Sequence, residues 1–127
     1  MTDAGSARWL GVAACVAGAS AVVLGALGAH ALHARLSPQM LDVWNTAVQF
    51  QFWHALALLA CVLLPRTRAA NFAAVLFATG IVLFCGSLYA LACGAPRAVG
   101  AITPIGGLVF IAGWIMLGVA FWNGRGR

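Results

Sequence analysis

The sequence predicts an all-α integral membrane protein: a single transmembrane domain built as a four-helix bundle of two helical hairpins, with both termini in the cytoplasm. Two observations indicate this class. Hydrophobic residues make up 64% of the 127 residues and charged residues only 7%, whereas a soluble domain carries about 25% charged residues. The apolar residues also fall into four charge-free runs, each near the ~20 residues that a span needs. These predicted spans are residues 9–29, 43–64, 69–92 and 101–122.

The first span is interpreted as a retained helix rather than a cleaved signal peptide. It is longer than the apolar region of a usual signal peptide, and three further spans follow it. Gly11, Gly18 and Gly25 recur along it at heptad spacing. Small residues on one face let helix backbones approach closely in a membrane. We therefore expect this helix to be an inner, tightly packed member of the bundle.

The second helix is expected to begin outside the membrane and then enter it. Ser37 is a favourable N-cap and Pro38 a favourable first helical residue. The helix start, about residues 38–44, would then lie in the membrane interface. Trp44 is predicted to be an aromatic anchor there.

The third and fourth spans are separated by the break Gly94-Ala95-Pro96-Arg97. The third is expected to be one continuous helix over residues 69–92. The fourth is expected to open at Thr103 as an N-cap, with Pro104 at the first helical position. Glycines along the fourth helix offer small faces for packing.

The distribution of arginine predicts the orientation. With the N-terminus in the cytoplasm, five arginines face the cytoplasm and two face outside, which satisfies the positive-inside rule. The inner set is Arg8, Arg66, Arg68, Arg125 and Arg127, and the outer set is Arg35 and Arg97. Because these residues occur singly or in pairs at the ends of apolar runs, they set topology. They do not form the basic patch with stacking aromatics that nucleic-acid binding needs.

Polar side chains within the spans form a candidate polar pocket. Such groups are costly in hydrocarbon, so they need partners inside the bundle or a wet cavity. At about 1.5 Å of rise per residue, they are predicted to gather in the outer half of the bundle. The set is His30, Gln49, Gln51, His54, Ser87, Tyr89 and Thr103.

Two interpretations of this set stay open, and we favour the first. In the first, the polar groups hydrogen-bond to one another and fix the helix register. In the second, they line a cavity open to the outside that binds a small polar ligand or a proton. Gln51 and His54 share one helical face with Ala47 and Leu58. A single intramembrane histidine without a carboxylate partner makes a poor proton relay, which weakens the second interpretation.

Neither a cofactor nor a metal site nor an enzymatic activity is predicted. Haem between two histidines is rejected because His54 should lie ~15 Å deeper than His30. Asp3 and Asp42 lie outside the spans, so no buried acid–base pair can form. No phosphate-binding glycine loop or paired metal ligands occur. The four cysteines fit no metal pattern and are interpreted as packing residues.

Four ordered segments resemble the YgdD family, a group of small, uncharacterised inner-membrane proteins with eukaryotic relatives. They are Gly25-Ala-Leu-Gly-Ala-His-Ala-Leu32, Phe50-Gln-Phe-Trp-His-Ala-Leu-Ala-Leu58, Phe84-Cys-Gly-Ser-Leu-Tyr89 and Gly100-Ala-Ile-Thr-Pro-Ile-Gly-Gly107. The resemblance implies a multi-pass bundle and no particular activity. The family's characteristic residues map onto His30, Gln51, His54, Gly86, Ser87, Tyr89, Thr103 and Pro104. Phe50 and Cys85 stand where the family is expected to have Tyr and Ser.

The sequence thus predicts an uncharacterised multi-pass protein of the bacterial inner (plasma) membrane with a structural or accessory role. The alternative is a small transporter or channel component that uses the polar pocket in the outer half of the bundle. The lipid bilayer is the expected partner. A second copy of the chain or another membrane protein is left open as a partner, and nucleic acid is excluded.

Overall fold

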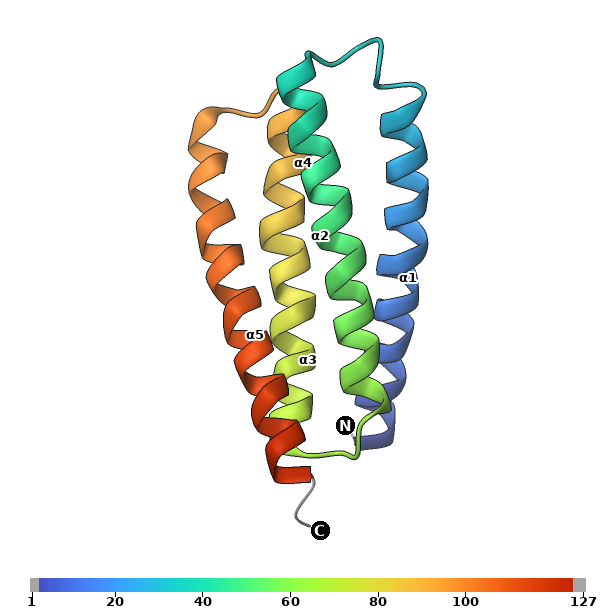
Figure 1. Cartoon of the computed structure of the whole chain (residues 1–127), viewed down its shortest axis with the longest axis vertical. Helices are drawn as coiled ribbons and strands as arrows, with labels where there is room; N and C mark the ends of the chain where they lie inside the picture. Colours follow the sequence, from blue (N-terminus) through green and yellow to red (C-terminus); the bar gives the residue numbers. More distant parts are fainter. Residues whose placement is uncertain (1–2, 125–127) are drawn as a thin grey trace.

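The computed structural model describes residues 3–124, which form four long helical stretches (Figure 1). The first two are α1 (Asp3–Ala29) and α2 (Pro38–Leu63). The third is built from α3 (Arg68–Gly80), the π-helical turn η1 (Ile81–Cys85) and α4 (Gly86–Ala92). The fourth is built from the 3-10 turn η2 (Arg97–Ala101) and α5 (Ile102–Gly124). The described residues contain no strand, which confirms the all-α fold class.

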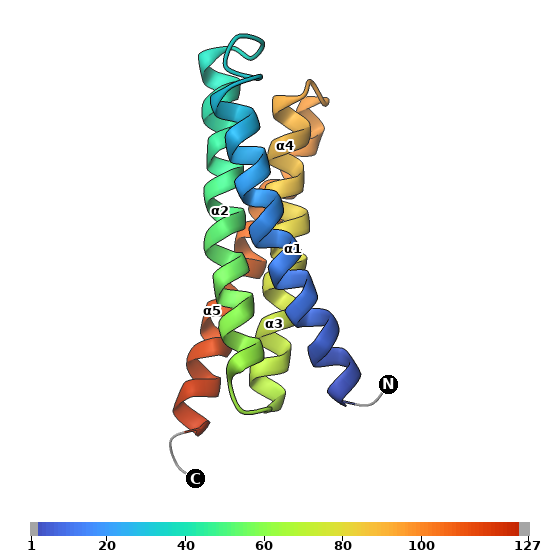
Figure 2. The same cartoon turned by 90° about the vertical axis from the view of Figure 1, so that its right-hand side faces the viewer.

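All four stretches are long and apolar enough to cross a membrane. α1 begins and α5 ends at the same end of the bundle, where the turn between α2 and α3 also lies (Figures 1 and 2). The connections from α1 to α2 and from α4 to α5 lie at the opposite end. The bundle therefore consists of two helical hairpins, as the sequence predicts.

α2 is the most buried of the four stretches and lies between α1 and the third stretch, while α5 packs on the third stretch. The side chains between them are mostly alanines and aromatic rings, so the helices approach closely. Gln51 and His54 enter this interior on the face of α2 that the sequence predicts. Among the buried core residues, the larger ones include Leu58, Phe77, Cys85 and Phe110, and the smaller ones include Ala47 and Ala73.

The expectation that the first helix is an inner member of the bundle is wrong. α1 is the least buried stretch; it packs mainly on α2, and its N-terminal end splays away from the other helices (Figure 2). With essentially one neighbour, it buries only a narrow stripe that contains Ala14, Ala21 and Gly28. Gly18, on the predicted packing stripe, has open space where a Cβ would be.

The predicted N-cap and first residue of the second helix are confirmed, but the predicted role of Trp44 is wrong. Ser37 Oγ accepts a hydrogen bond from the Met40 N–H at 3.2 Å, and Pro38 is the first helical residue. Trp44 is buried, 5% exposed, and its indole Nε1–H donates to the Leu24 carbonyl at 2.9 Å. The ring enters the bundle because Gly28 leaves room: a Cβ there would lie 2.7 Å from Trp44 Cδ1.

The third stretch is not a uniform α-helix. At η1 the Gly86 N–H reaches back to the Ile81 carbonyl, five residues earlier. A π-helical turn accommodates one extra residue and rotates the side chains that follow it. Within this turn the Phe84 backbone lies close against α5, since a Cβ on Gly106 would lie 2.7 Å from Phe84 Cα. The apolar run that predicts the helix contains no signal for this wide turn.

The predicted N-cap at Thr103 is also wrong. Arg97–Ala101 already forms a 3-10 turn that runs directly into α5, so the helical backbone begins before Thr103. The preceding break is closed by Gly94, whose φ of 98° suits glycine at a helix C-terminus. The Thr103 hydroxyl is thereby free to bond across to the neighbouring helix.

Candidate functional site

Gln51 ties three helical stretches together from the middle of α2. Its amide Nε2 donates to the Ala17 carbonyl at 2.9 Å and to Ser20 Oγ at 2.7 Å, both on α1. Its Oε1 accepts a hydrogen bond from the Tyr89 hydroxyl at 2.7 Å, on α4. Ser20 in turn donates to the Val16 carbonyl at 2.7 Å. Both ends of the Gln51 amide are therefore bonded to protein, which fits its 5% exposure.

His54 has both ring nitrogens occupied. Nδ1 lies 2.6 Å from the Phe50 carbonyl, which can only accept, so Nδ1 carries the proton. Nε2 accepts a hydrogen bond from the Trp114 indole at 3.1 Å, so it carries none. These two contacts assign a neutral ring in one tautomer. In this arrangement neither nitrogen is available to bind a metal or to pass on a proton.

Aromatic rings surround the His54 imidazole. It stacks on Phe110 with ring centroids 3.6 Å apart and an interplanar angle of 12°. Phe50, Phe77 and Trp114 lie within 6 Å, centroid to centroid. Apolar rings offer no hydrogen bond to a charged imidazolium, so this packing also favours the neutral imidazole.

Ser87 and Thr103 form a third polar contact, between α4 and α5. Their hydroxyl oxygens are 2.6 Å apart. Ser87 Oγ also lies 2.9 Å from the Phe84 carbonyl, to which only Ser87 can donate. Thr103 is therefore the donor to Ser87. The pair links the two helices of the second hairpin at the end away from the α2–α3 turn.

The structure brings five of the seven predicted site residues into the bundle, but not into one cluster. Gln51 meets Tyr89, Ser87 meets Thr103, and His54 bonds elsewhere. His30 and Gln49 are exposed and lie apart from these contacts. The predicted face of α2 is confirmed, since Gln51, His54, Ala47 and Leu58 are all buried.

Two partners escaped the sequence reasoning. Ser20 lies within the first span, where the cost of a buried hydroxyl could have marked it as a hydrogen-bonding residue. Trp114 lies within the fourth span, where an indole N–H that is buried usually finds an acceptor. Nothing in the spacing along one helix indicates which residue of another helix it faces. The pairings depended on inter-helix register.

Two grooves touch the predicted set from the outside of the bundle. One of about 590 Å³, between α2 and α5, reaches His54 and is lined mainly by apolar side chains such as Leu108 and Ile111. Another of about 320 Å³, between α1 and α2, includes Gln49 beside Phe52. Such lining suits the acyl chains of a bilayer. Among the described residues, every buried side-chain nitrogen and oxygen has a hydrogen-bond partner.

Comparisons with known proteins agree on one family. The family model described as "Protein of unknown function (DUF423)" matches residues 24–107. The UPF0382 membrane protein SH2409 of Staphylococcus haemolyticus is 48% identical over 95 residues, which cover 73% of this chain and 78% of that protein. The UPF0382 membrane protein YwdK of Bacillus subtilis is 44% identical over 104 residues, 79% of this chain and 85% of that one. No solved structure gives a significant match.

Proposed function

The chain belongs to the DUF423 family, and we propose that it acts in the bacterial plasma membrane as a structural or accessory protein rather than as a carrier or an enzyme. Its relatives are named UPF0382 membrane proteins, and its four apolar helices make it a multi-pass membrane protein of unknown function. We assign to the buried polar residues the role of holding the helices in register.

One observation carries this proposal: the buried polar side chains are already bonded to protein. Gln51 joins α1, α2 and α4, Ser87 joins α4 to α5, and His54 joins α2 to α5. A ligand or ion pathway requires polar groups that can exchange a protein partner for cargo. Here such an exchange would break contacts between helices. The arrangement is what residues that specify helix pairing would show.

The alternative, a small transporter or channel component, has one supporting feature. The groove between α2 and α5 reaches His54, and opening the Trp114 contact would expose Nε2 there. A proton could then bind the freed nitrogen. Two features favour the structural role instead: the groove is lined mainly by apolar side chains, and the neutral His54 ring is hydrogen-bonded at both nitrogens.

We also propose an orientation in the membrane and the absence of enzymatic activity. We place both chain ends in the cytoplasm because that side then holds most of the arginines. We assign no enzymatic activity, since the buried polar side chains among the described residues are amide, hydroxyl and imidazole groups and include no carboxylate. The more specific likeness to the YgdD family also belongs to this proposal.

Protein partners would meet the chain along its exposed apolar faces. α1 leaves Val16, Val22 and Val23 outside the bundle. In a bilayer such a face is covered by lipid or by another helix. We propose that the protein works beside a second copy or another membrane protein, and native mass spectrometry of the protein extracted with its lipids would report which.

Proton flux into liposomes separates the two functions. Purified protein is reconstituted with an internal pH-sensitive dye, and flux is driven by a potassium diffusion potential. We expect flux no higher than that of protein-free liposomes, and we expect His54→Ala to leave it unchanged. His54→Ala should also lower stability by roughly 1–2 kcal/mol, because it leaves the Trp114 indole without its acceptor and opens a cavity under Phe110.

His30→Ala is the matched control, since it removes an exposed imidazole. It should change neither flux nor stability. A protein-dependent proton flux that His54→Ala abolishes and His30→Ala preserves would overturn the structural proposal in favour of transport.

A further inference from the structure

The end of the bundle that holds the α2–α3 turn contains a hollow that the polar set above does not explain. It lies between this turn and the last turns of α5 and has a volume of about 860 Å³. Two arginines, a hydroxyl and an amide line it together with small and apolar residues. The lining residues are Pro65, Arg66, Thr67, Arg68, Ala69, Met116, Asn123 and Gly124.

The hollow carries positive charge, and no acidic residue in its lining neutralises that charge. Arg66 and Arg68 are both exposed, and none of the eight lining residues is acidic. Asp42 lies near the opposite end of α2. Helix dipoles do not supply this positive charge, because the positive start of α3 is opposed by the negative ends of α2 and α5. The two guanidinium groups therefore set the preference for an anion.

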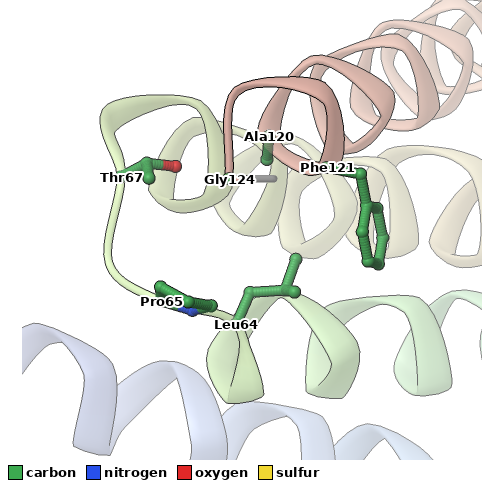
Figure 3. Close-up of a pocket in the computed structure, with 6 residues that line it drawn as sticks. All are labelled: Leu64, Pro65, Thr67, Ala120, Phe121 and Gly124. Carbon is green, nitrogen blue, oxygen red and sulfur yellow. The ribbon is translucent and has the colours of Figure 1, made fainter. Parts of the chain in front are cut away.

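A second, mainly apolar pocket of about 240 Å³ adjoins the first, and its six lining residues are drawn in Figure 3. Figure 3 shows Leu64 at the end of α2 and Phe121 on α5 on either side of it, with Ala120 and Gly124 on the last turns of α5. The two spaces share Pro65, Thr67 and Gly124. Basic and apolar surfaces thus meet at the level where the helices end.

We propose that this composite site binds the headgroup of an anionic phospholipid from the surrounding bilayer. The phosphate would lie against Arg66 and Arg68, whose planar guanidinium groups bond phosphate oxygens in pairs. The glycerol and the start of an acyl chain would occupy the apolar pocket beside Phe121. Basic pockets at the cytoplasmic ends of spanning helices suit anionic lipids, and the proposed orientation puts this end in that leaflet.

The apolar half distinguishes a lipid from a free anion. Inorganic phosphate would use the arginines but would gain nothing from Leu64, Ala120 and Phe121. A headgroup with its attached chain uses both halves at once. The site is independent of the register role proposed for Gln51 and His54, which lie farther along the bundle interior.

Native mass spectrometry of the purified full-length protein in detergent tests the site. Phosphatidylglycerol or phosphatidylcholine is titrated in, and the bound lipid is counted. We expect phosphatidylglycerol to bind more tightly and R66Q/R68Q to weaken it roughly tenfold or more, given the usual contribution of each arginine. The control R35Q/R97Q removes two charges from the other end and should keep the parent affinity.

Two additional variants and a competition with phosphate distinguish lipid binding from a general effect of charge. R66K/R68K should retain most of the binding because it keeps the charge, and R66Q alone, in the turn outside the helices, should give an intermediate loss. Millimolar inorganic phosphate should not displace the lipid. Equal affinity for the two lipids, equal losses in R66Q/R68Q and R35Q/R97Q, or full displacement by phosphate would each overturn the proposal. Circular dichroism of every variant confirms that the helices are intact.

Discussion

The two hairpins of this bundle are closed by different kinds of contact. α1 and α2 are joined by hydrogen bonds, from Gln51 to Ala17 and Ser20 and from Trp44 to Leu24. The third stretch and α5 share the Ser87–Thr103 hydrogen bond. Along the rest of their length they are held by close packing, in which aromatic rings and backbone atoms of one helix lie against glycines of the other. Cβ atoms at Gly80 and Gly113 would meet the rings of Phe110 and Phe77, and one at Gly106 would meet the Phe84 backbone.

The difference teaches which contacts tolerate change. In a bilayer no hydrophobic effect drives helices together, so close packing and hydrogen bonds must do so. A single hydrogen bond there contributes about 0.6 kcal/mol. Forcing an extra carbon into a filled contact costs about 1–3 kcal/mol. The glycine-lined hairpin should therefore be the less tolerant of the two.

Gly106→Ala tests the glycine-lined hairpin and should have the largest effect. The new methyl would lie 2.7 Å from Phe84 Cα and 2.8 Å from Phe84 Cβ, so a helix must shift. We expect a loss of about 3 kcal/mol in the free energy of unfolding, measured by titrating the folded protein with SDS. The neighbouring Gly107→Ala is the control, because its nearest Phe84 atoms would be 3.9 Å away. Equal losses in the two variants would contradict the packing argument.

Gln51→Leu tests the hydrogen-bonded hairpin and should have an intermediate effect. It removes three hydrogen bonds and leaves the Tyr89 hydroxyl without its acceptor. We expect a loss of about 1–2 kcal/mol in the same SDS titration. Gln49→Leu, two residues earlier and exposed, should change stability by less than about 0.5 kcal/mol. A double-mutant cycle with Tyr89→Phe should show coupling; purely additive losses would mean that the Gln51–Tyr89 bond contributes nothing.

Gly18→Ala should have the smallest effect and would show how loosely α1 is held. A Cβ at Gly18 meets no atom within 4 Å, and alanine is the better helix former. We expect stability to stay within about 0.5 kcal/mol of the parent or to rise slightly. Gly28→Ala on the same helix should be clearly destabilising, since its Cβ would lie 2.7 Å from Trp44 Cδ1. Similar results at both positions would mean that α1 packs differently.

Much of the architecture follows from the sequence alone. The length and apolarity of the runs predict four helices, and Ser37-Pro38 predicts where the second begins. The 3.6-residue period correctly puts Gln51 and His54 on the buried face of α2. These features are local, because each depends on residues within a few turns of one another.

Tertiary structure decided the partners. No local pattern indicates that Gln51 bonds to Ser20, that the Trp114 indole donates to His54, or that the Trp44 ring turns inward over Gly28. Nor does any local pattern indicate the π-helical turn, within which Phe84 lies against Gly106. Periodicity fixes which side of a helix is buried, but the sliding and rotation of one helix against another depend on how side chains interlock. That interlocking involves residues 16 to 60 positions apart, which no local pattern encodes.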